Sequence, residues 1–154
     1  MADTIIHNTF VVERSYGHPP ARVFAAFADP ALKRRWYAES RGHELDAFEL
    51  DFRVGGEETF TCRLGPGTPV AGLRIDNHSR HLDIVQNQRI VMSAVMHFNG
   101  TPGSVALLTF EFAAAGDGTD LVCTHQAVFY EGSDGPGMRQ HGWSALLDRV
   151  EAVL

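Results

Sequence analysis

The chain has few cysteines, few basic residues and no long apolar run, and each scarcity excludes a class of protein. Two cysteines among 154 residues make neither a disulfide framework nor a cysteine metal knuckle. Basic residues number 13 against 19 acidic ones, giving a net charge of −6, which argues against a nucleic-acid groove. No apolar stretch reaches the length of a membrane span. We therefore expect no nucleic-acid partner and no membrane insertion.

The motifs of several catalytic classes are missing as well. No glycine-rich loop follows a strand and opens a helix, as phosphate binding requires, and there is no Gly-x-Ser-x-Gly nucleophile elbow. His78 and His81 are three residues apart, but a catalytic zinc ion needs three convergent protein ligands. No spacing of His, Cys, Asp or Glu in the sequence indicates such a set. We expect neither a metal nor a cofactor.

Two further features have unremarkable interpretations. Met1-Ala2-Asp3-Thr4 lacks the basic and apolar regions of a signal peptide, so we expect a cytoplasmic protein. We expect Cys62 and Cys123, which each lie within an expected strand, to be reduced core residues. The basic cluster Lys33-Arg34-Arg35 lies within an expected short helix. We interpret it as a solvated helix face rather than a phosphate site.

Hydrophobic periodicity predicts a strand, two short helices, about six antiparallel strands and one long helix in a single domain. The first helix spans about 20–28, and Asp29-Pro30 starts a second one that ends near Tyr37. From His43 onward the period changes to two. The expected strands are 5–16, 48–54, 57–64, 70–85 with an irregular middle or a break, 90–98, 105–112 and 121–130.

The last residues carry an apolar stripe at helical spacing. After a glycine-rich loop over 131–137, with Ser133 or Asp134 as the helix cap, the stripe consists of Trp143, Leu146, Leu147, Val150 and Leu154. Neither this stripe nor one face of an antiparallel sheet is stable alone in water, so the helix must cover the sheet. The sequence thus predicts an α+β fold.

A series of short motifs supports a more specific comparison. They are 20–30, Trp36-Tyr37, 51–56, 82–85 followed by 89–91, 116–119, and Gly142-Trp143 with 147–151. In this order they resemble the SRPBCC superfamily of START-like domains, and within it the branch named after the C-terminal domain of the activator of the heat-shock protein 90 ATPase. Gln86 stands where the family often has proline, and we expect this to change only the turn.

The resemblance implies a helix-grip (START/Bet v-like) fold, in which a curved antiparallel sheet wraps the long C-terminal helix and two short helices follow the first strand. It also implies a cavity between sheet and helix for a small hydrophobic or amphipathic molecule. We expect the cavity wall to include Trp36, Tyr37, Phe52, Phe60, Met92, Phe110, Cys123, His125, Phe129, Trp143 and Leu147.

Several of these residues have two interpretations. His125 shares a strand face with Leu121, Cys123 and Phe129, so it is either a cavity acid, base or ligand donor, or a bonded core histidine. Trp36, Tyr37 and Trp143 are either ligand contacts or packing residues. Asp51 and Arg53 alternate with apolar neighbours, which favours a charge ladder on the outer sheet over a catalytic role.

The sequence leaves three functions open. The leading one is binding of a small hydrophobic or amphipathic ligand. A cyclase or hydratase that uses His125 with a cavity hydroxyl is the second, and co-chaperone activity, suggested only by the family name, is the third. A homodimer through the sheet or an edge strand is compatible with each, because open sheets leave edges to protect.

Overall fold

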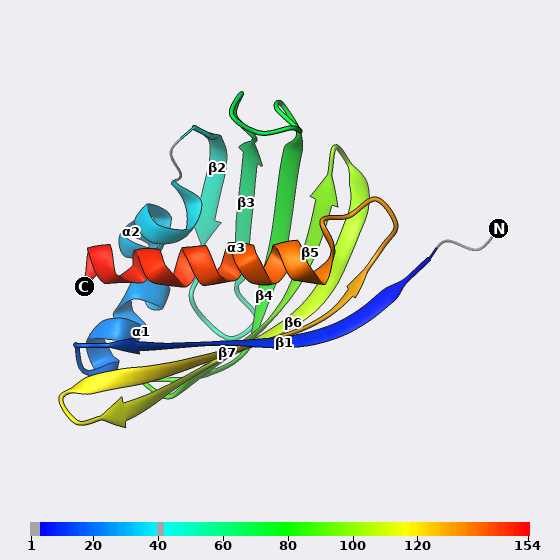
Figure 1. Ribbon diagram of the computed structural model, residues 1–154. Coiled ribbons are helices and arrows are strands. Elements are labelled where there is room, and N and C mark those ends of the chain that lie inside the picture. Colours follow the sequence, from blue (N-terminus) through cyan, green and yellow to red (C-terminus); the bar gives the residue numbers. More distant parts are fainter. Residues whose placement is uncertain (1–3, 40–41) are drawn as a thin grey trace.

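The computed structural model describes residues 4–39 and 42–154 and confirms the expected order of elements (Figure 1). Met1 to Asp3, which enter the argument about a signal peptide, lie outside the described residues. The elements are β1 (Ile6–Tyr16), α1 (Pro20–Ala28), α2 (Pro30–Lys33), the π-helical turn η1 (Arg34–Ala38), β2 (Glu44–Leu50), β3 (Glu57–Arg63), β4 (Arg74–Val85), β5 (Arg89–Phe98), β6 (Thr101–Ala115), β7 (Gly118–Phe129), α3 (Gly135–Arg149) and the 3-10 turn η2 (Val150–Val153).

The seven strands form one antiparallel sheet in the order β1-β7-β6-β5-β4-β3-β2. In Figure 1, β2, β3 and β4 stand behind α3, whereas β1, β6 and β7 sweep beneath it, so the sheet curves around the helix. The helices α1 and α2 lie near the C-terminal end of α3. This arrangement confirms the helix-grip fold.

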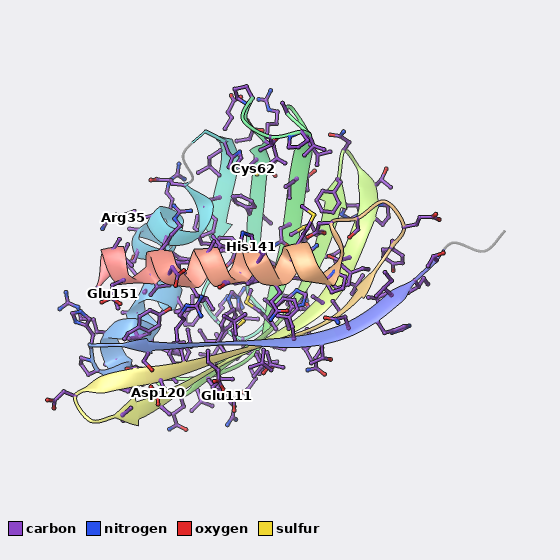
Figure 2. All side chains as sticks on the ribbon, viewed as in Figure 1. Arg35, Cys62, Glu111, Asp120, His141 and Glu151 are labelled. Atoms are coloured by element: carbon purple, nitrogen blue, oxygen red, sulfur yellow. The ribbon has the colours of Figure 1, made fainter. Side chains whose placement is uncertain are left out.

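One face of the sheet carries the core and the other faces solvent. Along β6 and β7, Phe110, Phe112 and Leu121 are buried. Figure 2 shows their neighbours Glu111 and Asp120 on the side of the sheet turned away from α3. Strict alternation of this kind is what a half-buried antiparallel sheet requires.

The terminal helix is fastened to β1 by polar contacts as well as by packing. The Tyr16 hydroxyl donates a 2.6 Å hydrogen bond to the Leu147 carbonyl oxygen, and the Arg14 guanidinium lies 2.8 Å from the Asp148 carboxylate. Leu147 and Val150 are fully buried, as the stripe predicts. The α-helix nevertheless ends at Arg149. Val150 lies on the 3-10 turn, and Leu154 follows that turn.

The basic cluster departs most from its expected environment. Within the second expected helix, only Pro30–Lys33 is α-helical. The chain then widens into the π turn, which is closed by a 2.9 Å hydrogen bond from the Glu39 amide to the Arg34 carbonyl. Lys33 is 3% exposed, so the interpretation of a fully solvated helix face was wrong for this residue. Its side chain points inward and pairs with the Glu58 carboxylate.

Two strands also differ from their expected limits. β2 ends at Leu50, so Phe52 and Val54 follow the strand, and Asp51 pairs with Arg53 at 2.8 Å within the turn instead of forming a charge ladder. β4 is one continuous strand that begins at Arg74, with its irregular register between His81 and Asp83. Residues 70–73 form the preceding turn.

The start of α3 differs from the prediction for a physical reason. Asp134 occupies the N-cap position, but its side chain caps no amide, and both of its carboxylate oxygens accept hydrogen bonds from Arg139. The Gly135 amide instead donates a 3.2 Å hydrogen bond to the hydroxyl of Ser133, the other expected cap. The helix begins at Gly135, inside the stretch expected to be a loop.

Candidate functional site

A row of small side chains crosses the middle of the sheet. Strand register places Ser79 opposite Ala94, and Ala94 opposite Ala106, on three consecutive strands. All three are buried and face α3. We call these three residues the central row. Because small side chains cannot reach the helix above them, the row leaves space under α3.

Other inward-facing side chains flank the central row on both sides. A second row lies two residues from the central row in one direction along the strands and consists of Asn77, Met96 and Ser104. A third row lies two residues away in the opposite direction and consists of His81, Met92 and Leu108, of which His81 is outside the cavity lining. The helix contributes Met138, Gly142, Trp143 and Leu146. The result is a cavity of about 230 Å³ between the sheet and α3.

One end of the cavity holds a buried ion pair. The Lys33 Nζ atom lies 2.5 Å from the Glu58 carboxylate, and the two side chains are 4% and 3% exposed. The ammonium group also lies 5.0 Å from the centre of the Tyr37 ring, a cation–π distance. Glu58 is opposite Ser79 on the neighbouring strand, so the pair closes the end of the central row.

A neutral hydrogen-bonding pair lies beside the ion pair. The Asn77 side-chain amide donates a 2.8 Å hydrogen bond to the Tyr37 hydroxyl, while Oδ1 of Asn77 has no partner within residues 4–39 and 42–154. Burial, followed by the nearby Glu58 carboxylate, raises the pKa of Tyr37 above its usual range. The phenol therefore stays protonated.

A second ion pair lies where α3 begins. The Arg139 guanidinium binds the Asp134 carboxylate at 2.8 Å, donates a 3.0 Å hydrogen bond to the Ser104 hydroxyl and lies 5.1 Å from the centre of the Phe129 ring. Arg139 is 8% exposed. A guanidinium held by a carboxylate, a hydroxyl and an aromatic face is a rigid part of the wall.

His125 lies in the wall formed by β7. Its ring stacks on Phe10 with centroids 4.5 Å apart and lies 6.1 Å from the Phe129 ring. Burial, reinforced by the charge of Arg139, lowers the pKa of His125 to about 4. The imidazole is therefore neutral at physiological pH, and in the described part of the chain its Nδ1 atom has no hydrogen-bond partner.

The structure brings together only part of the set expected on the cavity wall. Trp36 lies behind the wall: its indole donates a 2.7 Å hydrogen bond to the Ala26 carbonyl and packs on Phe27. Phe110 also packs on Phe27, and Leu147, a member of the helix stripe, is fully buried. Tyr37, Phe60, Met92, His125 and Trp143 line the cavity, and Trp36, Phe52, Phe110, Cys123, Phe129 and Leu147 lie outside its lining.

Sequence reasoning missed most of the polar lining, although signals for it existed. Arg139 precedes Trp143 by four residues, so it continues the helix stripe toward the N-terminus. Glu58 precedes Phe60 by two residues on one strand, which places both on the same face. The remaining polar lining residues that the sequence reasoning did not place on the cavity wall are Lys33, Asn77, Ser79, Ser104 and Asp134.

Two negative findings apply to the described residues. Among them no three His, Cys, Asp or Glu side chains come together as a group that could hold a metal ion. Nor does any helix in residues 4–39 and 42–154 have the length and apolar character to cross a membrane.

The curved sheet, the long terminal helix and the space between them define a helix-grip domain. The chain belongs to the family described as Activator of Hsp90 ATPase homolog 1-like protein, whose model matches residues 17–154. It matches none of the curated proteins.

Solved structures with the same fold include close and more distant relatives. The Mll3558 protein from Rhizobium loti is 40% identical, with 98% of this chain and 99% of that chain covered and a TM-score of 0.87. An uncharacterized protein from Rhizobium leguminosarum is 34% identical, with 99% and 97% covered and a TM-score of 0.88. Protein CV1439 from Chromobacterium violaceum is 26% identical, with 95% and 96% covered and a TM-score of 0.76.

Proposed function

We propose that this protein binds a small amphipathic molecule in the cavity between the sheet and α3. The observation that carries the proposal is the cavity above the central row, where Ser79, Ala94 and Ala106 leave space that larger side chains would fill. Close packing is the rule in protein interiors, and a large void without a ligand costs stability. A family of helix-grip domains is a suitable setting for such a site.

The size of the cavity limits the ligand. An apolar cavity of about 150 Å³ is enough for benzene. The cavity here is about 230 Å³, so a molecule with one or two rings, or a short branched chain, matches it better than a sterol or a long lipid. Aromatic and sulfur-containing side chains such as Trp143, Phe60 and Met92 suit a planar, polarisable ligand.

The chemistry of His125 favours binding over acid–base catalysis. A general base works best when its pKa lies near the operating pH, and burial lowers the pKa of His125 to about 4. No hydrogen bond joins its ring to a carboxylate in the described residues, so nothing orients it as a catalytic dyad would. The cyclase or hydratase alternative is tested by His125→Ala: loss of turnover with retained ligand affinity would support it.

Ligand binding itself is tested in two measurements. Native mass spectrometry of the freshly purified protein should reveal a co-purifying small molecule and its mass. Equilibrium dialysis with one-ring and two-ring aromatic compounds should then give dissociation constants, which we expect in the micromolar range for the best of them. A panel that shows no binding to the folded protein contradicts the proposal.

A further inference from the structure

We propose that the ligand is an uncharged molecule with a hydroxyl group, which is held at the Asn77–Tyr37 end of the cavity; this inference rests on the proposed function above. The two residues lie on different elements, β4 and η1, and meet through the 2.8 Å hydrogen bond between the Asn77 amide and the Tyr37 hydroxyl. Both line the cavity.

The charges of the lining are balanced without a ligand. Lys33 is paired with Glu58 at 2.5 Å, and Arg139 is paired with Asp134 at 2.8 Å. These are the cationic residues in the lining. A carboxylate or phosphate ligand would have to compete with Glu58 or Asp134 for a cation. An ammonium ligand would have to compete with Lys33 or Arg139 for a carboxylate. Burying an unpaired charge is costly, so the site favours an uncharged molecule.

The hydrogen-bonding capacity of the lining is not balanced in the same way. Asn77 is 7% exposed, and its Oδ1 atom has no partner among the described residues. An unsatisfied buried polar group costs about 1–3 kcal/mol, which a ligand group can recover. A hydroxyl group suits this amide in either orientation, because it donates to the amide oxygen and accepts from the amide nitrogen.

The adjacent phenol strengthens the choice of a hydroxyl group. The Tyr37 oxygen accepts the hydrogen bond from Asn77, and its own proton stays in place because burial opposes ionisation. A ligand hydroxyl between the two side chains can therefore donate to one and accept from the other. Within residues 4–39 and 42–154, His125 is the other lining residue with a buried, unpartnered side-chain atom, but its ring is stacked on Phe10.

Three probes of the same two-ring framework test the inference by equilibrium dialysis at neutral pH: naphthalene, 2-naphthol and 2-naphthoate. We expect the protein to bind 2-naphthol about tenfold more tightly than naphthalene, and 2-naphthoate more weakly than 2-naphthol. Asn77→Leu should reduce the naphthol-to-naphthalene ratio to near one. Tyr37→Phe, which removes only the hydroxyl, should reduce it severalfold and decides the matter if Asn77→Leu does not fold.

The chain offers a matched control. The Oδ1 atom of Asn8 on β1 is also buried and has no partner in the part of the chain that the structure describes. Asn8 does not line the cavity, so Asn8→Leu should leave the ratio unchanged. Equal affinity for naphthol and naphthalene, tighter binding of naphthoate, or loss of the ratio in His125→Leu instead of Asn77→Leu overturns the inference.

The same experiment separates the inference from the proposed function. Naphthalene binding that is abolished by filling the central row, without any preference for naphthol, refutes the hydroxyl anchor and leaves the binding function standing. Failure of all three probes to bind refutes both.

Discussion

Replacing Ala106 with leucine fills the space on which the account depends. Ala106 lies in the central row on β6, faces the cavity and is 6% exposed. Leucine adds three carbon atoms at this position, and burying each contributes about 0.8 kcal/mol. The upper limit is therefore about 2.4 kcal/mol. Imperfect rotamers reduce the gain, so we expect the free energy of unfolding to rise by about 1–2 kcal/mol.

The same substitution should abolish ligand binding. Three additional carbon atoms above the central row occupy the volume that a two-ring molecule needs, and we expect the affinity for 2-naphthol to fall at least tenfold. Ala113→Leu is the matched control, because Ala113 lies on the same strand with an exposed side chain. Ala113→Leu should leave both the affinity for 2-naphthol and the free energy of unfolding close to those of the original protein. Urea unfolding and equilibrium dialysis on the three proteins make the comparison.

Two results would refute this reasoning. Unchanged naphthol affinity in Ala106→Leu would show that the ligand binds elsewhere. A fall in the free energy of unfolding by more than about 1 kcal/mol would show that side chains already fill the space above the central row, because overpacking a full core is destabilising.

Further predictions concern stability. Lys33→Met should lower the free energy of unfolding by about 3–5 kcal/mol, because it leaves the Glu58 carboxylate buried without its cation. Lowering the pH should destabilise the fold: His125 binds a proton in the unfolded state below about pH 6.5 but in the folded state only near pH 4, so about 3 kcal/mol is lost across this interval. Tyr16→Phe should cost about 1–3 kcal/mol, because it removes the 2.6 Å hydrogen bond to the Leu147 carbonyl.

Denaturant unfolding checks each of these predictions. For the ion pair, the double variant with Lys33→Met and Glu58→Leu should recover most of the stability, and a single variant as stable as the original protein would contradict the argument. For the pH dependence, His125→Leu should flatten the curve between pH 6.5 and 4. Some slope should remain, because burial also lowers the pKa of His81. For Tyr16, an unchanged midpoint would show that the hydrogen bond contributes nothing.

The fold was predictable because its signals are periodic. Alternation along the strands and the helix stripe at Trp143, Leu147 and Val150 are properties of one element at a time, and the sequence displays them directly. The residues at which helices and strands begin and end were harder to predict. The π turn at 34–38 contacts β2 and α3, and no periodic pattern in the sequence indicates it.

The candidate site was predictable only in part, because it depends on register. Ser79, Ala94 and Ala106 are far apart in the sequence, and each is an ordinary small residue on its strand. They form a row only when three strands pair with one particular alignment. The apolar wall residues Phe60, Met92 and Trp143 could be named because periodicity places each on the inward face of its own element and the family resemblance implied a cavity there. The same reasoning also named Phe52, Phe110, Cys123 and Phe129, which lie outside the lining.

The buried charges were missed for a related reason. Lys33 stands in a basic cluster, which in isolation indicates a solvated surface, and its partner Glu58 is on another element. Charged residues are rarely buried without a partner, so the burial of one cannot be inferred before the other is located. Composition describes the surface well, but it does not identify which charges are paired inside.

A crystal structure of the protein grown with 2-naphthol tests the central claim most directly. The account predicts electron density for the two rings above Ser79, Ala94 and Ala106, against Trp143, with the naphthol oxygen within hydrogen-bond distance of Asn77 or Tyr37. A cavity closed by repacked side chains, with naphthol absent or bound on the outer surface, would contradict it.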